Sequence, residues 1–143
     1  MELGTFGAVM KFALELETEA LGYYERALEK VVGDELKSLL TSLRERCSKR
    51  ILTLERIRRE NVTEMILEPI KGFESDSYSF DLDVPQSEND GLLCETAIAI
   101  EELRNRFYEK GSVKIEFLIE AATAFDRLAD ENHDNMASLR LAL

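Results

Sequence analysis

Apolar and small residues recur at helical spacing in four segments of the chain, and this periodicity restricts the fold more than any other feature of the sequence. The stripes predict helices over about 5–32, 34–60, 88–110 and 113–141. A chain of 143 residues with this pattern fits one domain over residues 1–143. We therefore expect an all-α four-helix bundle.

Capping and breaking residues set the expected ends of these helices. Thr5 is suited to cap the first helix, and Gly33 with Asp34 ends it and starts the second. Because that connection is short, the second helix is expected to lie antiparallel to the first. Gly111 and Ser112 are expected to separate the third and fourth helices in the same way.

Residues 61–87 break the helical pattern and contain both prolines of the chain, so they predict a long crossover between the second and third helices. A structureless loop of this length is unusual in a compact domain, and we expect a short helical turn over 62–67. Ser87, with Asp90 three residues later, resembles a capping box for the third helix. Three aromatic residues are expected to hold the rest of the crossover against the bundle: Phe73, Tyr78 and Phe80.

The chain is strongly acidic, with 29 acidic and 18 basic residues and a formal charge of −11. Such a protein repels phosphate backbones and anionic headgroups, so neither nucleic acid nor a membrane is an expected partner. The basic run over 44–59 is interrupted by Glu45 and Glu55 and is typical of a solvated helix face. The two cysteines form no disulfide framework, and no apolar stretch reaches the length of a membrane span, so we expect a cytoplasmic location.

The two halves of the chain resemble each other. At one constant offset the first helix falls on the third, and with one extra residue the second falls on the fourth. The equivalent pairs are Glu17 and Glu101, Tyr24 and Tyr108, Cys47 and Asn132, and Arg50 and Asn135. This repeat predicts two similar antiparallel helix hairpins joined by the crossover.

Polar residues interrupt the apolar stripes at similar heights along all four predicted helices. A polar group buried in this way is costly unless it is paired, so these positions are the candidate site. The interrupting residues are Glu17, Arg50, Glu101, Arg104, Asn132 and Asn135, with Cys47 beside Arg50. One carboxylate on each of two helices, with an i, i+3 pair on each of the other two, is the plan of a di-iron carboxylate bundle.

The sequence here resembles the rubrerythrin branch of the ferritin-like superfamily over most of its length. The likeness lies in residues 17–25, 43–50, 101–109 and 128–135 and in the long crossover. It implies a ferritin-like fold and a homodimer. It also implies metal ligands at a Glu on the first and third helices and at a Glu-x-x-His pair on the second and fourth.

Only Glu17 and Glu101 match those ligands, so the resemblance points to a degenerate di-iron site. The other four ligand positions hold Cys47, Arg50, Asn132 and Asn135. Arg104 stands where a small residue is usual. A guanidinium stays protonated and cannot ligate a metal, and Arg50 would repel the ions it replaced.

We therefore expect Arg50 and Arg104 to pair with Glu17 and Glu101. Two amides and two hydroxyls are expected to satisfy the remaining lone pairs: Asn132, Asn135, Tyr24 and Tyr108. In this interpretation the protein is a non-catalytic scaffold or interaction protein without a cofactor, and its partner is a second copy or another protein.

The alternative is a metal-binding ferritin-like oxidoreductase that oxidises iron or reduces peroxide, with iron or another divalent metal on Glu17 and Glu101. It requires further ligands, and His133 is the only histidine of the chain. A one-residue shift of the fourth helix would turn Asp130 and His133 inward as an i, i+3 pair. That shift would expose Leu128 and Leu139.

Cys47 and three tyrosines also have a reactive and a structural interpretation. A neighbouring arginine lowers the pKa of a thiol, so Cys47 could be a redox group, or it could be a small core residue. Tyr23, Tyr24 and Tyr108 could carry a radical or a proton in an enzyme, or they could be core residues with satisfied hydroxyls.

Overall fold

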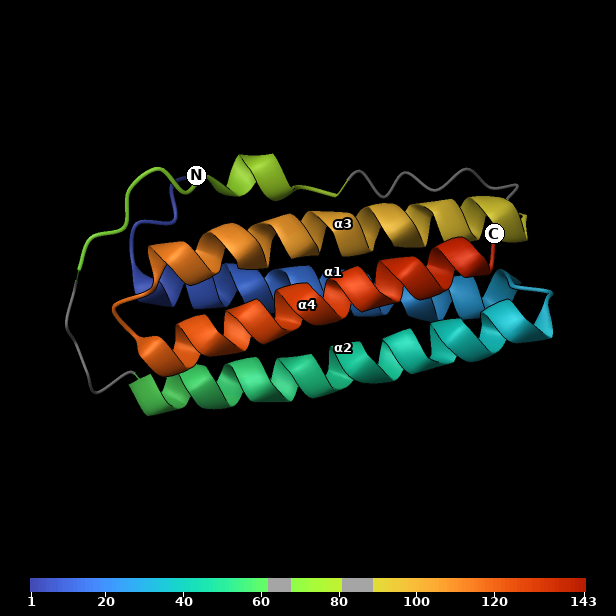
Figure 1. The fold of residues 1–143 in the computed structure, drawn as a ribbon, viewed down its shortest axis with the longest axis horizontal. Coiled ribbons are helices and arrows are strands. Elements are labelled where there is room, and N and C mark those ends of the chain that lie inside the picture. The colour runs from blue at the N-terminus through green and yellow to red at the C-terminus, as the bar shows by residue number, and fades with distance from the viewer. Residues whose placement is uncertain (62–67, 81–88) are drawn as a thin grey trace.

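The computed structural model describes residues 1–61, 68–80 and 89–143, which form four long helices and one turn of 3₁₀ helix. These are α1 (Phe6–Lys30), α2 (Asp34–Asn61), η1 (Ser75–Tyr78), α3 (Asp90–Lys114) and α4 (Ile119–Leu141). The long helices lie side by side (Figure 1), which confirms an all-α four-helix architecture. No strand occurs in the described ranges, where Glu2 and Glu74 form an isolated bridge. The turn predicted over 62–67 and the predicted cap Ser87 lie outside these ranges.

The ends of α1 and α2 lie close to their predicted positions. Thr5 caps α1 as expected, because its hydroxyl oxygen accepts a hydrogen bond of 3.0 Å from the backbone N–H of Ala8. The helix ends at Lys30, two residues earlier than predicted, and α2 runs to Asn61. None of the helices in the described ranges has an apolar stretch long enough to cross a lipid bilayer.

The predicted boundary between the last two helices is wrong. The sequence indicated a break at Gly111 and Ser112, but α3 continues to Lys114 and α4 begins only at Ile119. Both small residues are buried inside α3. A Cβ atom on Gly111 would lie 2.8 Å from the ring of Phe125, so this glycine allows α3 and α4 to approach each other.

The helix α3 begins at Asp90, two residues later than predicted. Asn89 is the N-cap, and its side chain accepts a hydrogen bond from the backbone N–H three residues later. The carboxylate of Asp90 instead accepts hydrogen bonds from the N–H groups of Val32, at 3.0 Å, and Gly33, at 2.8 Å. Asp90 therefore joins the start of α3 to the connection between α1 and α2.

The first residues of the chain pair with the crossover. The N–H of Leu3 donates to the carbonyl of Phe73 at 2.8 Å, and the N–H of Ile70 donates to the carbonyl of Gly4 at 3.0 Å. Between these pairs, Gly72 takes a φ of +72°, a left-handed conformation that favours glycine. Leu3 is 1% exposed, so this segment belongs to the core.

The predicted contact of the crossover aromatics with the bundle is confirmed. Phe73 stacks on Phe107 of α3 with ring centroids 5.2 Å apart, and Tyr78 meets the same ring edge-on at 5.4 Å. Phe73 and Tyr78 are buried, whereas Phe80 is partly buried. These rings hold residues 73–80 against the bundle.

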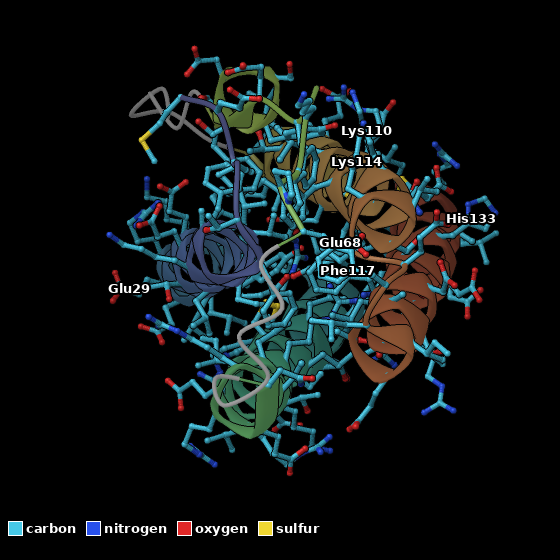
Figure 2. All side chains as sticks on the ribbon, turned by 90° about the vertical axis from the view of Figure 1, so that its left-hand side faces the viewer. Glu29, Glu68, Lys110, Lys114, Phe117 and His133 are labelled. Carbon is cyan, nitrogen blue, oxygen red and sulfur yellow. The ribbon has the colours of Figure 1, made fainter. Side chains whose placement is uncertain are left out.

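The hydrophobic core consists of two clusters along the length of the bundle. One contains Met10, Ala13, Leu54, Phe107 and Phe125 among others, and the second contains Ala20, Leu40, Leu43, Ala97 and Leu139 among others. The closest helix packing lies within the pairs α1–α2 and α3–α4. Figure 2, which looks along the bundle, shows the four helices arranged around a common centre. Buried polar residues, among them Glu17 between Leu16 and Ala20, lie at the level where the two clusters meet.

Candidate functional site

The structure brings the predicted site residues together from all four helices. Each of the seven side chains is at most 3% exposed: Glu17 on α1, Cys47 and Arg50 on α2, Glu101 and Arg104 on α3, and Asn132 and Asn135 on α4. Together with the fully buried Tyr24 and Tyr108, they are called the polar centre below.

Arg104 bridges the two buried carboxylates. Its Nη1 donates to Glu17 Oε1 at 2.5 Å, and its Nη2 donates to Glu101 Oε1. Nη1 also lies 3.5 Å from the sulfur of Cys47. Because this guanidinium is 1% exposed, its positive charge is balanced by protein groups rather than by water. Its Nε has no hydrogen-bond partner among the described residues.

Arg50 joins α2 to α1 and α4. Its Nη1 donates to Glu17 Oε2 at 3.4 Å and to Asn132 Oδ1 at 3.1 Å, and its Nη2 donates to the carbonyl of Leu128 at 3.1 Å. Its Nε donates to Glu131 at 3.2 Å. The two guanidiniums therefore contact different oxygens of the Glu17 carboxylate, Arg50 at Oε2 and Arg104 at Oε1.

The remaining lone pairs of both carboxylates are satisfied by the groups that the sequence predicted. Tyr24 and Tyr108 donate their hydroxyl protons to Glu101 and Glu17, each at 2.6 Å. The side-chain amides of Asn132 and Asn135 donate to Glu101 Oε2 at 2.6 and 3.2 Å. Glu17 thus accepts hydrogen bonds from α2 and α3, and Glu101 accepts them from α1, α3 and α4, so both oxygens of each carboxylate have donors.

The polar centre holds two carboxylates and two guanidiniums. Burial alone would raise the pKa of Glu17, but the nearby charges of Arg104 and Arg50 and the hydroxyl of Tyr108 lower it below its ordinary value. Burial opposes the charge of both arginines, yet the carboxylates raise their pKa values. The lowered pKa of Glu17 and the raised pKa values of the two arginines all favour the charged forms, so the polar centre is a buried ionic network.

Burial holds Cys47, Tyr24 and Tyr108 in their protonated forms, because it raises the pKa of each group. Burial raises the pKa of the Cys47 thiol to about 12, which outweighs the effect of Arg104 and removes the basis for a redox thiol. Burial and the neighbouring carboxylates raise the pKa values of Tyr24 and Tyr108. The hydroxyl of Tyr23 donates to the carbonyl of Leu93 at 2.8 Å, so all three tyrosines have satisfied hydroxyls.

The alternative register of α4 is wrong. Asp130 and His133 are exposed, and Figure 2 shows His133 on the outside of the bundle. Leu128 is 7% exposed and Leu139 is 0% exposed, so the apolar stripe of α4 faces the core in the register that places Asn132 and Asn135 inward. His133 is therefore not available to the polar centre.

Two residues extend the polar centre to the surface and were missed from the sequence. The exposed Arg46 donates to Asn135 Oδ1, and Glu131, whose side chain is 40% exposed, accepts from Arg50. Arg46 lies one helical turn before Arg50, and Glu131 lies next to Asn132. Both therefore sit at the edge of the buried face, where sequence spacing alone does not distinguish an inward from an outward side chain.

The polar centre does not fit a pair of iron ions. A di-iron site needs several carboxylates and imidazoles, whereas here two carboxylates are already bound to guanidinium and hydroxyl groups. In the described part of the chain, no group of three or more His, Cys, Asp or Glu side chains is placed to hold a metal ion. The guanidiniums of Arg50 and Arg104 bring positive charge to the place where a cation would have to bind.

The polar centre is thus what distinguishes this bundle from one with a wholly apolar core. The chain matches no protein-family model, no curated protein and no solved structure.

Proposed function

We propose that the chain is a structural or interaction protein: a ferritin-like bundle of two similar antiparallel hairpins in which an ionic network takes the place of a di-iron centre. One observation carries this proposal. The guanidinium of Arg104 lies between the carboxylates of Glu17 and Glu101, the two residues that match the ligands of the rubrerythrin branch. The other four ligand positions lie around the same carboxylates and supply a guanidinium, a thiol and two amides.

Charge balance explains why such a centre has no need of a metal. Two buried carboxylates without cations would repel each other and would favour the protonated form. Arg104 and Arg50 supply two positive charges at the same place, and the centre becomes neutral as a whole. The network fixes the relative positions of the four helices, which is the role best supported for buried ionic groups.

A bundle with this centre acts through its surface. We propose that it works as a homodimer, as the resemblance implies, and that it does not oxidise iron or reduce peroxide. The two cysteines, which form no disulfide framework, support a cytoplasmic location. The acidic exterior, with a formal charge of −11, supports a protein rather than a nucleic acid as its partner.

Metal binding tests the proposal directly. Protein purified without chelator is offered ferrous iron without oxygen, desalted, and then exposed to oxygen while its visible spectrum is recorded. We expect far less than one iron per chain and no oxo-bridge absorption. About two irons per chain with that absorption would overturn the proposal.

A variant with the missing ligands restored is the matched positive control. It combines Cys47→Glu, Arg50→His, Asn132→Glu and Asn135→His with Arg104→Ala, which removes the bridging guanidinium. We expect this variant to bind iron if its circular dichroism shows a folded bundle. Iron in the variant but not in the natural chain would attribute the loss of metal binding to these positions.

A further inference from the structure

The outward-facing side of α2 carries a large exposed apolar residue in the middle of the helix. It is defined here by Asp34, Glu45, Lys49, Leu52 and Arg59, which are all exposed and lie opposite the buried stripe of the helix. Leu52 is 67% exposed in the middle of a long helix. The other exposed large apolar residues of the described ranges all lie at or near the ends of helices or of the chain.

Charges on this α2 face are separated along the helix. Asp34 and Glu45 lie toward its start, and Lys49 and Arg59 lie toward its end. None of these four side chains forms a hydrogen bond or an ion pair within residues 1–61, 68–80 and 89–143. Arg56 on the same helix differs, because it pairs with Glu60 at 3.1 Å and with Glu120 at 3.5 Å.

We propose that the α2 face binds the α2 face of a second copy of this chain in antiparallel orientation. With the two-fold axis between residues 46 and 47, Asp34 of one copy faces Arg59 of the other, and Glu45 lies across the axis from Lys49. Symmetry repeats each pair, so four ion pairs form without a facing pair of like charges. Leu52 of each copy packs on the small side chain of Thr41 of the other. This inference rests on the proposed homodimer and names its interface.

Electrostatics favours this face over the others for self-association. Two copies that each carry a charge of −11 repel at long range, so a dimer requires a surface on which the charges balance. The exposed side of α4 carries Asp126, Asp130 and Asp134, which would meet like charges in a symmetric contact. A contact built from exposed ion pairs is weak, and salt screens it.

Sedimentation equilibrium at low and high salt tests the interface through Lys49→Glu and the double variant Glu45→Lys with Lys49→Glu. Reversal of Lys49 alone turns two attractive pairs into repulsive ones and is expected to raise the dissociation constant at least about tenfold. Reversal of both residues restores opposite charges across the axis, so the double variant is expected to dimerise like the natural chain. Raising the salt concentration is expected to weaken both dimers.

Lys110→Glu is the matched control, because it changes the net charge by the same amount on the exposed outer side of α3 (Figure 2). It is expected to change the dissociation constant by less than about threefold. A monomer at every concentration and salt level would overturn the inference, as would a dimer that Lys49→Glu leaves intact or that the double variant fails to restore. Metal content is measured separately. A negative result for the interface therefore does not affect the test of the metal-free centre.

Discussion

Replacement of Arg104 by methionine tests the physical account of the polar centre most directly. Methionine keeps much of the volume of the side chain and removes its charge. Removing one partner of a buried ion pair costs about 3–5 kcal/mol, because the other charge stays in the core without compensation. Arg104 contacts both carboxylates, and in the described structure Glu101 pairs with no other cation. We therefore expect Arg104→Met to lower the free energy of unfolding by about 5 kcal/mol.

Arg50→Met is the matched comparison, and we expect it to lower the free energy of unfolding by less, about 3 kcal/mol. Glu17 would keep its contact with Arg104 at 2.5 Å and its hydrogen bond from Tyr108. For a chain of this length, 1 kcal/mol shifts the melting temperature by about 2–4 °C. The two variants should thus melt about 10–20 °C and about 6–12 °C below the natural protein, followed by circular dichroism at pH 7.

A double-mutant cycle separates lost charge pairing from lost packing. Glu101→Gln removes the carboxylate that Arg104→Met leaves unpaired, so the double variant should be more stable than Arg104→Met alone by about 2 kcal/mol. The deficit of Arg104→Met should also shrink as the pH is lowered from about 8 to about 5, since an uncompensated buried carboxylate favours the protonated form. A cost below about 1 kcal/mol for Arg104→Met, or strictly additive losses in the cycle, would refute the reasoning.

Three further predictions follow from individual groups. The pKa of Glu17 is lowered from its ordinary value of 4.5. The stability that Glu17 contributes is therefore complete above that pH and is lost as the pH falls through its folded pKa. Melting temperatures of Glu17→Gln should accordingly decline less steeply with falling pH than those of the natural protein. Cys47, with a pKa of about 12, should resist iodoacetamide at pH 8 until urea unfolds the protein. Gly111→Ala should lower the free energy of unfolding by about 1–3 kcal/mol in urea titrations, because its Cβ would meet the ring of Phe125 at 2.8 Å.

Periodicity predicted which residues face the core, but it did not predict where α3 ends. Glu17, Arg50 and Asn132 interrupt apolar stripes whose 3.6-residue spacing favours an inward orientation, and all three are buried. Gly111 was interpreted as a helix breaker from its backbone freedom alone. Its place inside α3 depends on the ring of Phe125, a contact with a different helix that no local rule contains.

The partners within the polar centre were partly predictable. Two acids and two bases at one level of a bundle must pair, since unpaired burial is costly, and this reasoning identified the contacts of Arg50 and Arg104. It did not identify Arg46 or Glu131, because long side chains at the edge of a buried face reach inward or outward according to their neighbours. The pairing of Leu3 with Phe73 was not predicted either, since no periodic pattern covers so short a segment.

The polar centre also bears on the order in which the protein folds. Most of its hydrogen bonds join one helix pair to the other: Arg104 and Tyr108 of α3 reach Glu17 of α1, and Arg50 of α2 reaches Asn132 of α4. The α1–α2 and α3–α4 contacts are local in sequence, so we expect them to form first and these bonds to be complete only after the pairs dock and exclude water. Changes in the network should therefore accelerate unfolding far more than they slow folding, as stopped-flow measurements across urea concentrations would show. The ionic centre then sets chiefly the lifetime of the native state.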